Sequence, residues 1–414
     1  MSNSCVAVVG TADTKGAELD YLRAVIEGVG VGCRVVDVGV RGPAACSAFV
    51  AAHEVMRTAG VEPDEFRAMG RSDALGQMAR GATTIVRGWL DDGHIDGVLC
   101  LGGSGGASVA AQLMRSLPLG VPKIVVTTQV PISAEQIIGT NDVILFPTVA
   151  DLAGINRVTR PILHNAAMSL VGMVGHPLHN VLTDSRYVVA ASMIGITTPG
   201  LSAARTSLEA AGAEVITFHV TGPGGLAMER LLEPCGVTGV LDASTVELAD
   251  MVVGSPRRVD PARLLGAGRL GIPQVVSLGG LDIARFGPQE SVPEGFRRRL
   301  WHVHNELVTL VRPTVAESRR IGQELGSRLS QATGAVRVLV PLGGLSTLSV
   351  EGGPLYDADA DAAVIAGLRE GLTDASRISF LEHNINDAAF ATQMSSALIE
   401  LMDRPEGTRS IRNA

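Results

Sequence analysis

The chain has 414 residues, a formal net charge of −8, 46% hydrophobic residues and only 3% aromatic ones. This length exceeds what one hydrophobic core usually serves and indicates two domains, while the acidic balance argues against a general nucleic-acid surface or an anionic-membrane surface. No apolar segment is long enough to span a membrane and the first residues lack the basic region of a secretion signal, so we expect a cytoplasmic protein.

The first half of the chain alternates short apolar runs with helical patterns. The apolar runs predict strands at 5–9, 34–38, 97–101, 123–127 and 143–146. The helical patterns lie at 16–28, 71–90 and 106–116. Such alternation predicts a parallel sheet with helices packed on its faces.

The same alternation restarts near residue 185. Apolar runs predict strands at 188–196, 214–218, 238–241, 274–277, 336–341 and 377–381. A connecting helix is expected at 160–174, and turn-forming residues at 175–180 mark the boundary between the two series. We therefore predict an α/β protein with two doubly wound, Rossmann-like parallel-sheet domains, 1–180 and 181–414, and a ligand crevice between them.

The first apolar run ends in a turn that is typical of anion binding. The residues that could contact an anion there are Gly10, Thr11, Asp13, Thr14 and Lys15. A helix that starts after such a turn offers free N–H groups and the positive end of its dipole to a phosphate, and Asp13 could hold a metal ion or a sugar hydroxyl. The spacing is not that of the true phosphate loop, and a simple helix cap explains such a turn about equally well.

A second glycine-rich turn follows the run at 97–101. It consists of Gly102, Gly103, Ser104, Gly105 and Gly106. Small residues in succession let backbone N–H groups approach an anion closely, although tight packing of a helix on a strand is the alternative. Further polar residues that could reach the same crevice, or could cap helices instead, are Thr128, Gly139, Thr140 and Asp142.

Polar residues in the second half also follow predicted strands. His219 comes directly after one strand and could act as a general acid or base, or could be a structural histidine bonded to the backbone. Asp242 could cap a helix or pair with His219. The later residues Asp282, His304 and Arg312 suit an acidic small molecule, although helix capping and surface pairing explain most of them singly.

Taken in order, these motifs resemble the Tm-1-like ATP-binding family, also known as the UPF0261 proteins. The motifs are GTADTK at 10–15, LGGSGG at 101–106, FHVTGPGG at 218–225, DASTVELAD at 242–250, HVHN at 302–305 and HNIND at 383–387. The resemblance covers nearly the whole chain. It implies two α/β subdomains, an adenine nucleotide (ATP with Mg²⁺) bound to the first through the motifs at 10–15 and 101–106, and a homodimer.

The chain departs from the family pattern at two places. Leu278-Gly279-Gly280 stands where relatives usually have Pro-Gly-Ala, and Val311-Arg312-Pro313 stands where they have Met-Arg-Thr. Pro313 fixes φ and removes an N–H group, so we expect the loop that carries Arg312 to be re-aimed and substrate choice to differ. Plant relatives continue into a TIM-barrel domain, and a separate barrel protein could be the partner of this chain.

Three classes of function follow. The first is an ATP-dependent enzyme, in which Lys15 and the glycine loops would neutralise phosphate charge and Asp13 or Asp142 would hold magnesium. Its substrate would be an unidentified small acidic or carbonyl compound, and the catalytic residues acting on it would be His219, Asp282, His304 and Arg312. The second class is a module that senses ATP or binds a protein without chemistry. The third is an enzyme for another phosphorylated ligand.

Overall fold

The computed structural model describes residues 4–176 and 185–403. The chain divides into two compact units, Met1–Val181 and Leu182–Ala414, called here the amino-terminal and carboxyl-terminal units. None of the helices in the described ranges is long and apolar enough to cross a bilayer.

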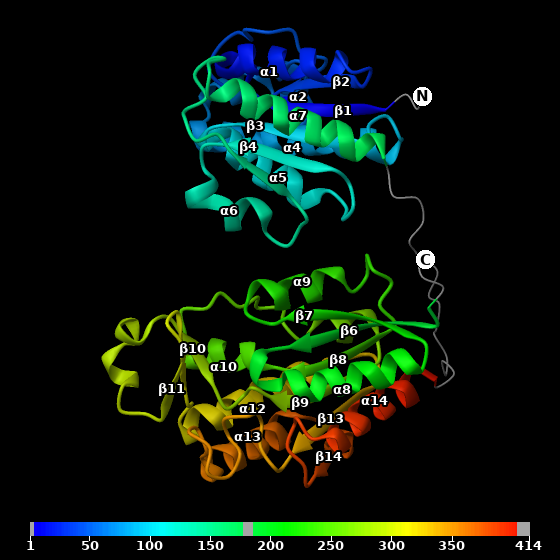
Figure 1. Ribbon diagram of the computed structural model, residues 1–414, viewed down its shortest axis with the longest axis vertical. Coiled ribbons are helices and arrows are strands. Elements are labelled where there is room, and N and C mark those ends of the chain that lie inside the picture. Colours follow the sequence, from blue (N-terminus) through cyan, green and yellow to red (C-terminus); the bar gives the residue numbers. More distant parts are fainter. Residues whose placement is uncertain (1–3, 177–184, 404–414) are drawn as a thin grey trace. The chain divides into compact units, whose positions relative to one another are not determined.

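The amino-terminal unit is built on a five-stranded parallel sheet (blue to cyan-green in Figure 1). Its strands, in spatial order, are β2 (Gly32–Asp37), β1 (Cys5–Gly10), β3 (Gly97–Gly102), β4 (Lys123–Thr127) and β5 (Ile144–Pro147). The register brings the last residues of neighbouring strands side by side: Gly10 pairs with Asp37, and Thr127 pairs with both Gly102 and Pro147. The loops that leave these strands therefore meet at one carboxyl-terminal edge.

Helices cover both faces of this sheet, and the strands are apolar on both sides. Val6 and Val8 pack against one face, with helices α1 (Ala12–Glu27) and α7 (Thr159–Gly175). Ala7 and Val9 pack against the other face. The helices on that face are α2 (Ala52–Thr58), α4 (Arg71–Asp91), α5 (Ser104–Ser116) and α6 (Val130–Ile138), with α3 (Pro63–Ala68) beside them. Continuous apolar strands are what a parallel sheet covered on both faces requires.

The carboxyl-terminal unit has a six-stranded parallel sheet. Its strands, in spatial order, are β14 (Ile378–Leu381), β13 (Val336–Pro341), β9 (Gln274–Gly279), β8 (Gly239–Ser244), β6 (Tyr187–Met193) and β7 (Ala213–His219). One face carries α8 (Thr198–Ala210) and α14 (Ala388–Asp403). The other carries α9 (Pro223–Leu231), α10 (Val246–Val253), α11 (Gly266–Leu270), α12 (Val315–Ser330) and α13 (Ala358–Gly371).

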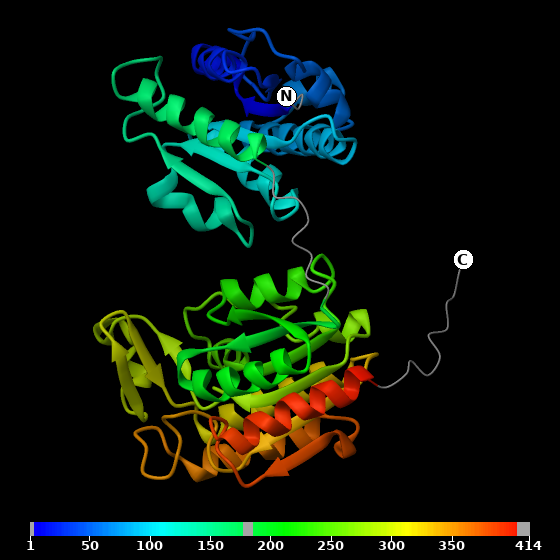
Figure 2. The same ribbon diagram turned by 45° about the vertical axis from the view of Figure 1, so that its right-hand side comes forward.

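A small antiparallel sheet interrupts the βα alternation of the carboxyl-terminal unit. It consists of β10 (Ala284–Phe286), β12 (Val308–Val311) and β11 (Trp301–Asn305), in that spatial order. Figures 1 and 2 show it at one end of this unit, in yellow-green, beyond the ends of the parallel strands. Short 3-10 helices lie at Gly195–Thr197, Gln289–Ser291, Glu294–Phe296 and Ala375–Arg377. The sequence does not predict this excursion.

The α/β fold with doubly wound parallel sheets is confirmed. In each sheet the first strand, β1 or β6, has the second strand of the chain on one side and the third strand on the other. The carboxyl ends of β1 and β3, and of β6 and β8, are therefore the topological switch points. Open α/β sheets bind their ligands at such points. The candidate sites are therefore expected at the carboxyl-terminal edges of the two sheets.

Candidate functional sites

The amino-terminal unit has a cavity of about 530 Å³ at its carboxyl-terminal edge. The loops after β3, β4 and β5 line it with Gly103, Ser104, Thr128, Gln129, Pro131, Pro147, Thr148, Val149, Ala150 and Asp151. The lining is mixed, and its polar side chains are those of Ser104, Thr128, Gln129, Thr148 and Asp151, which could hold a ligand by hydrogen bonds. The structure thus brings together the predicted residues Gly103, Ser104 and Thr128.

Helix α5 begins at the wall of this cavity. Gly103 precedes the helix in an extended conformation, and Ala107 N–H makes the first bond of the helix, to the Gly103 carbonyl. The N–H groups of Ser104, Gly105 and Gly106 come before that bond and have no acceptor four residues earlier within the helix. Together with the helix dipole, these donors favour an anion.

The glycines of this turn have different roles. A Cβ atom on Gly102 would lie 2.7 Å from the Gly106 Cα, and one on Gly106 would lie 3.0 Å from the Leu101 carbonyl oxygen, so both allow the helix to pack on its strand. Gly103 is open, with Thr128 Oγ1 as its nearest neighbour at 3.9 Å. A Cβ atom on Gly105 would meet Arg71 Nη2 at 3.3 Å. Arg71 therefore places a cation beside the helix start, which sequence reading missed because Arg71 lies on another helix.

Backbone strain marks the opposite wall of the same cavity. Val149 has φ of 63°, a left-handed conformation that β-branched residues rarely adopt, and its side chain is 87% exposed. Thr148 is buried, and its hydroxyl donates to the Ala150 carbonyl at 2.6 Å, which holds the turn in shape. Strained backbone that the surrounding structure maintains is typical of ligand-binding loops.

The turn after β1 is filled by the carboxylates of the chain itself. Asp37 accepts hydrogen bonds from the N–H groups of Ala12 and Gly39 at 2.9 and 2.8 Å, and burial raises the pKa of this carboxyl. Asp13 accepts from the N–H groups of Val40 and Arg41 at 3.1 and 2.8 Å. Asp37 thus takes the Ala12 N–H at the start of α1, which an anion would otherwise use, so the geometry favours α5 over α1 as the phosphate site.

The other predicted residues of the first turn have local partners. The hydroxyls of Thr11 and Thr14 lie 2.8 Å apart and bond to each other. Lys15 Nζ donates to the carbonyl of Leu152, the residue that follows Asp151 of the cavity wall. Gly10 is packed tightly, because a Cβ atom there would lie 2.8 Å from Leu19 Cδ2. The β1 turn supports the edge of the sheet and is joined through Lys15 to the loop of the cavity.

Three residues predicted to reach the crevice lie at the amino-terminal edge of the sheet, opposite the cavity. Helix α6 returns the chain to the amino-terminal edge, so Gly139, Thr140 and Asp142 precede β5 there. Asp142 forms an ion pair with Lys123, the first residue of β4, at 2.6 Å, and Gly139 adjoins the side chain of Arg115 in the last turn of α5. The expectation that these residues share the crevice with the glycine turns is wrong.

The residues do not form a ready site for a magnesium ion. Asp13 Oδ2 already accepts two N–H groups, and Asp13 Oδ1 is buried without a partner. Asp142 is at the opposite edge and neutralised by Lys123. In the described part of the chain no group of three His, Cys, Asp or Glu residues could hold a metal.

The carboxyl-terminal unit has a cavity of about 340 Å³, also at the carboxyl-terminal edge. Segments after β6 and β7, the loop after α10 and the antiparallel sheet line it with Ile194, Gly195, Ile196, His219, Thr221, Arg257, Ile283, Arg285, His304, Asn305, Val308 and Leu310. The structure thus brings His219 and His304 to one cavity, although they are distant in the sequence. Two imidazoles in one cavity can supply an acid and a base.

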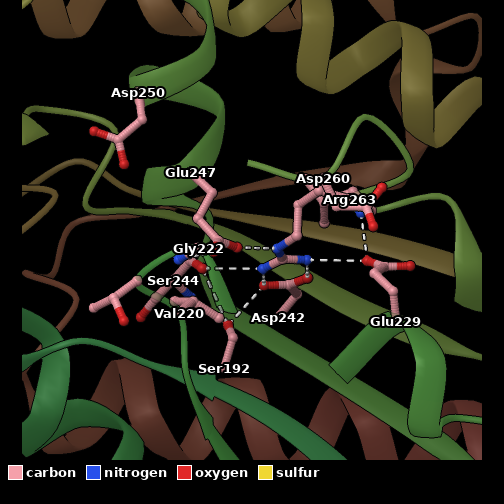
Figure 3. A network of polar contacts seen from close by, with 12 residues as sticks. Ser192, Val220, Gly222, Glu229, Asp242, Ser244, Glu247, Asp250, Asp260 and Arg263 are labelled. Atoms are coloured by element: carbon pink, nitrogen blue, oxygen red, sulfur yellow. Dashed lines mark hydrogen bonds and ion pairs between the residues drawn. The ribbon is translucent and has the colours of Figure 1, made fainter. Parts of the chain in front are cut away.

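A buried polar network around Arg263 reaches the turn after β7, next to the cavity residues His219 and Thr221 (Figure 3). Arg263 Nη2 donates to Asp242 Oδ1 at 2.7 Å and Arg263 Nε donates to Glu247 Oε2 at 2.6 Å. Glu229 lies at 3.4 Å from the same guanidinium, and burial raises the pKa of Glu229. Asp242 therefore pairs with Arg263 and not with His219. Sequence reading missed Arg263, which lies in the turn before α11 and not at the end of a predicted strand.

The network holds the turn that carries His219. Glu247 Oε1 accepts the N–H of Gly222 at 2.5 Å, and Arg285 Nη1 donates to the Val220 carbonyl at 2.8 Å. Arg285 is itself fixed by Asp250, whose Oδ2 accepts from Arg285 Nε at 2.8 Å. Buried charges that are paired and hydrogen-bonded in this way hold their segments in one arrangement.

Two predicted catalytic residues lie outside the cavity lining. Arg312 is buried and forms an ion pair with Asp361 at 2.6 Å. Asp282 is also buried, and its Oδ2 accepts a hydrogen bond from the Ser346 hydroxyl at 2.6 Å. Burial raises the pKa of Asp282, and it raises the pKa of Asp361 to about 6. Both residues thus have partners in the protein, while Arg312 Nε, Arg312 Nη1 and Asp282 Oδ1 are buried without one in the described structure, so their roles toward a substrate stay predictions.

The fold and the cavities define a class of two-unit α/β proteins with a cavity at the carboxyl-terminal edge of each sheet. Two family models match the chain: "Uncharacterised protein family (UPF0261) N-terminal domain" at residues 4–179 and "Uncharacterised protein family (UPF0261) C-terminal domain" at residues 186–402. The chain belongs to the UPF0261 family, as its motifs predict.

Curated relatives agree with this assignment. A UPF0261 protein of Clostridium tetani is 38% identical over 404 residues, which cover 97% of this chain and 100% of the relative. The ToMV resistance protein Tm-1(GCR237) of Solanum lycopersicum is 35% identical over 418 residues, which cover 96% of this chain. The chain spans 55% of the length of that plant protein.

Solved structures show only a distant likeness. A UDP-GlcNAc 2-epimerase of Methanocaldococcus jannaschii, in complex with UDP-GlcNAc and UDP, covers 97% of this chain and 93% of its own, with 8% identity and a TM-score of 0.22. At this level the likeness carries no argument about ligand or activity.

Proposed function

We propose that this chain binds a nucleotide and holds its phosphates at the start of α5, in the cavity of the amino-terminal unit. The observation that carries the proposal is the start of α5: Gly103 and Ser104 line a cavity of about 530 Å³, and the Ser104 N–H comes before the first hydrogen bond of the helix. The cation of Arg71 next to Gly105 and the strained loop at Val149 support it. The adenine base, the Mg²⁺ ion that accompanies it and a homodimer are expectations from the family resemblance.

We further propose that the nucleotide is a substrate of an ATP-dependent enzyme. A small acidic or carbonyl compound would bind in the cavity of the carboxyl-terminal unit and would receive a phosphoryl or adenylyl group. His219 and His304 would move protons at that compound, since both line the cavity. The buried network around Arg263 would keep the His219 turn in position.

A second candidate function is a sensor that binds ATP without consuming it. One observation favours it: Asp151 is the one titratable side chain among the residues that line the amino-terminal cavity. A site whose lining offers one carboxylate and no histidine, lysine or cysteine can bind phosphates without cleaving them.

The test is a calorimetric titration of the full chain with ATP, ADP, AMP and pyrophosphate. In the variant Ser104→Asp, a carboxylate at the helix start would repel phosphate, while the helix dipole would tolerate the charge and preserve the fold. Ser108→Asp adds the same charge one turn further along α5, where Ser108 is also exposed. We expect Ser104→Asp to weaken nucleotide binding at least tenfold, about 1.4 kcal/mol, and Ser108→Asp to have a clearly smaller effect.

Equal losses in the two variants, or unaltered binding in Ser104→Asp, would place the phosphates elsewhere. Release of ADP or AMP in the presence of a small acid supports the enzyme, and binding without release supports the sensor. Binding of pyrophosphate or another phosphorylated compound without binding of ATP would leave the third class, an enzyme for a different phosphorylated ligand.

A further inference from the structure

The cavity of the carboxyl-terminal unit contains an arginine, Arg257, that forms no ion pair within the described residues. Arg257 lies in the loop after α10, and its backbone N–H donates to the Ser255 hydroxyl at 3.3 Å. Its guanidinium reaches the Phe286 carbonyl through Nη2 at 3.4 Å, the long limit for a hydrogen bond. Its Nε is buried without any acceptor in the described structure, and no carboxylate of the described residues forms an ion pair with it.

The neighbouring arginine shows the contrast. Arg285 also lines the cavity, but Asp250 binds its guanidinium and also accepts its backbone N–H at 2.7 Å. The charge of Arg285 is therefore neutralised within the protein. Arg257 is the cation of this cavity that remains available to a ligand, and a buried N–H without a partner favours a ligand that supplies an acceptor.

The rest of the lining offers donors and apolar surface but no carboxylate. Asn305 Oδ1 accepts the N–H of Leu307 at 2.9 Å, which leaves the amide NH₂ of Asn305 for a ligand. The hydroxyl of Thr221 and the two imidazoles add polar contacts. The apolar part of the lining consists of Ile194, Ile196, Ile283, Val308 and Leu310. One cation, several donors and an apolar wall suit an acceptor-rich anion with a short hydrocarbon body.

We propose that this cavity binds a small monocarboxylate and that Arg257 is its carboxylate anchor. A planar guanidinium pairs with a planar carboxylate through parallel hydrogen bonds. A single unpaired cation matches one negative charge better than the two charges of a phosphate monoester. The volume of about 340 Å³ lies at the small end of ligand pockets, which range from about 300 to 1,000 Å³.

This inference rests on the part of the proposed function that places the substrate in the carboxyl-terminal unit. It narrows the acidic or carbonyl compound to a carboxylate with a short apolar body. It also replaces Arg312 by Arg257 as the residue that orients the substrate. In this arrangement the carboxylate would lie at Arg257, and the remainder of the molecule would extend toward His219, His304 and the apolar wall.

The test is a calorimetric titration of the full chain, without nucleotide, with propionate, butyrate, lactate and pyruvate. Propionamide is the control that lacks the negative charge, and inorganic phosphate is the control that carries a different anion. We expect at least one of the four carboxylates to bind with Kd below about 1 mM, and propionamide and phosphate to bind at least tenfold more weakly.

Two variants separate the anchor from a general effect of charge. Arg257→Gln removes the cation from the cavity, and Arg258→Gln removes the adjacent cation, which is exposed and does not line the cavity. We expect Arg257→Gln to weaken carboxylate binding at least tenfold and Arg258→Gln to change it less than about threefold, with thermal melting showing that both variants are folded.

The proposal is overturned if none of the four carboxylates binds, if phosphate binds more tightly than all of them, or if the two variants lose affinity equally. Nucleotide binding is measured separately through Ser104→Asp, in the other unit of the chain. A failure of carboxylate binding is therefore distinguishable from a failure of nucleotide binding.

Discussion

At the scale of single residues, the candidate chemistry depends on His219 and His304, which line one cavity. The sequence predicts His219 from its place after a predicted strand, and His304 as part of a group of polar residues that suits an acidic small molecule. It does not reveal that Asp282 and Arg312 are buried in contacts with the protein, because neither residue type nor spacing tells which side of a loop is covered. Arg257 escaped the sequence reading because it follows a helix and not the end of a predicted strand.

The two histidines give a direct prediction for the enzyme. We expect His219→Gln and His304→Gln each to lower, by about 100-fold, the rate at which ATP is consumed in the presence of the small-acid substrate. General acid–base catalysis contributes at least this much. Nucleotide affinity, measured by titration, should remain unaltered since the nucleotide cavity belongs to the other unit. Full turnover in the double variant would remove both residues from the mechanism.

Asp361 gives a prediction about stability and pH. Burial raises its pKa to about 6, compared with about 3.8 for an exposed aspartate, despite the ion pair with Arg312. Between these two pH values the folded state retains a proton that the unfolded state has released. The contribution of Asp361 to stability is therefore complete below about pH 4 and is lost as the pH rises to about 6.

The amide of Asp361→Asn imitates the protonated carboxyl and does not titrate. The free energy of unfolding of this variant, relative to the natural chain, should rise by about 2 kcal/mol between pH 4.5 and pH 7. Urea unfolding at several pH values measures it. A difference that stays constant, or that changes in the opposite direction, would show that the attraction of Arg312 outweighs burial.

At the scale of elements, α12 and α13 pack unusually close because glycines lie at their contact. A Cβ atom on Gly367 would lie 2.0 Å from the Arg319 carbonyl oxygen, and one on Gly322 would lie 2.0 Å from that of Val364. The exposed helical Gly172 of α7 has no atom within 4 Å of such a position. Substitution by alanine should therefore change the free energy of unfolding in opposite directions at the two kinds of glycine.

We expect Gly367→Ala to destabilise the chain by about 1–3 kcal/mol, because the helices must separate. Gly172→Ala should be neutral or stabilise it by up to about 1 kcal/mol through the higher helix propensity of alanine. Thermal or urea unfolding measures both. Equal effects of the two substitutions would contradict the packing argument.

The elements of the parallel sheets could be predicted from the sequence because buried parallel strands are continuous apolar runs. Val336–Pro341 is an example, with one face packed on α12 and α13. The strand Trp301–Asn305 could not be predicted in this way, since it is short, half exposed and contains two histidines. The polar cluster before β5 was placed at the wrong edge because the short helix α6 was not recognised between it and β4.

At the scale of the whole molecule, the two units of the chain have the same α/β architecture. Each unit has its own parallel sheet, its own core on both faces and a cavity at the carboxyl-terminal edge. The two linings differ in chemistry. The amino-terminal one is rich in small residues and open backbone donors, and the carboxyl-terminal one contains imidazoles, an unpaired guanidinium and aliphatic side chains. This difference is what a nucleotide and a small organic acid would require.

The most direct measurement is amide hydrogen exchange of the full chain with and without saturating ATP. The account predicts slower exchange in the segments 103–107 and 147–151, where the start of α5 and the strained loop border the cavity. Exchange in the segment 11–16 should change little, because its polar groups already have partners within the protein. Protection confined to 11–16, or no protection anywhere in the amino-terminal unit, would contradict the account.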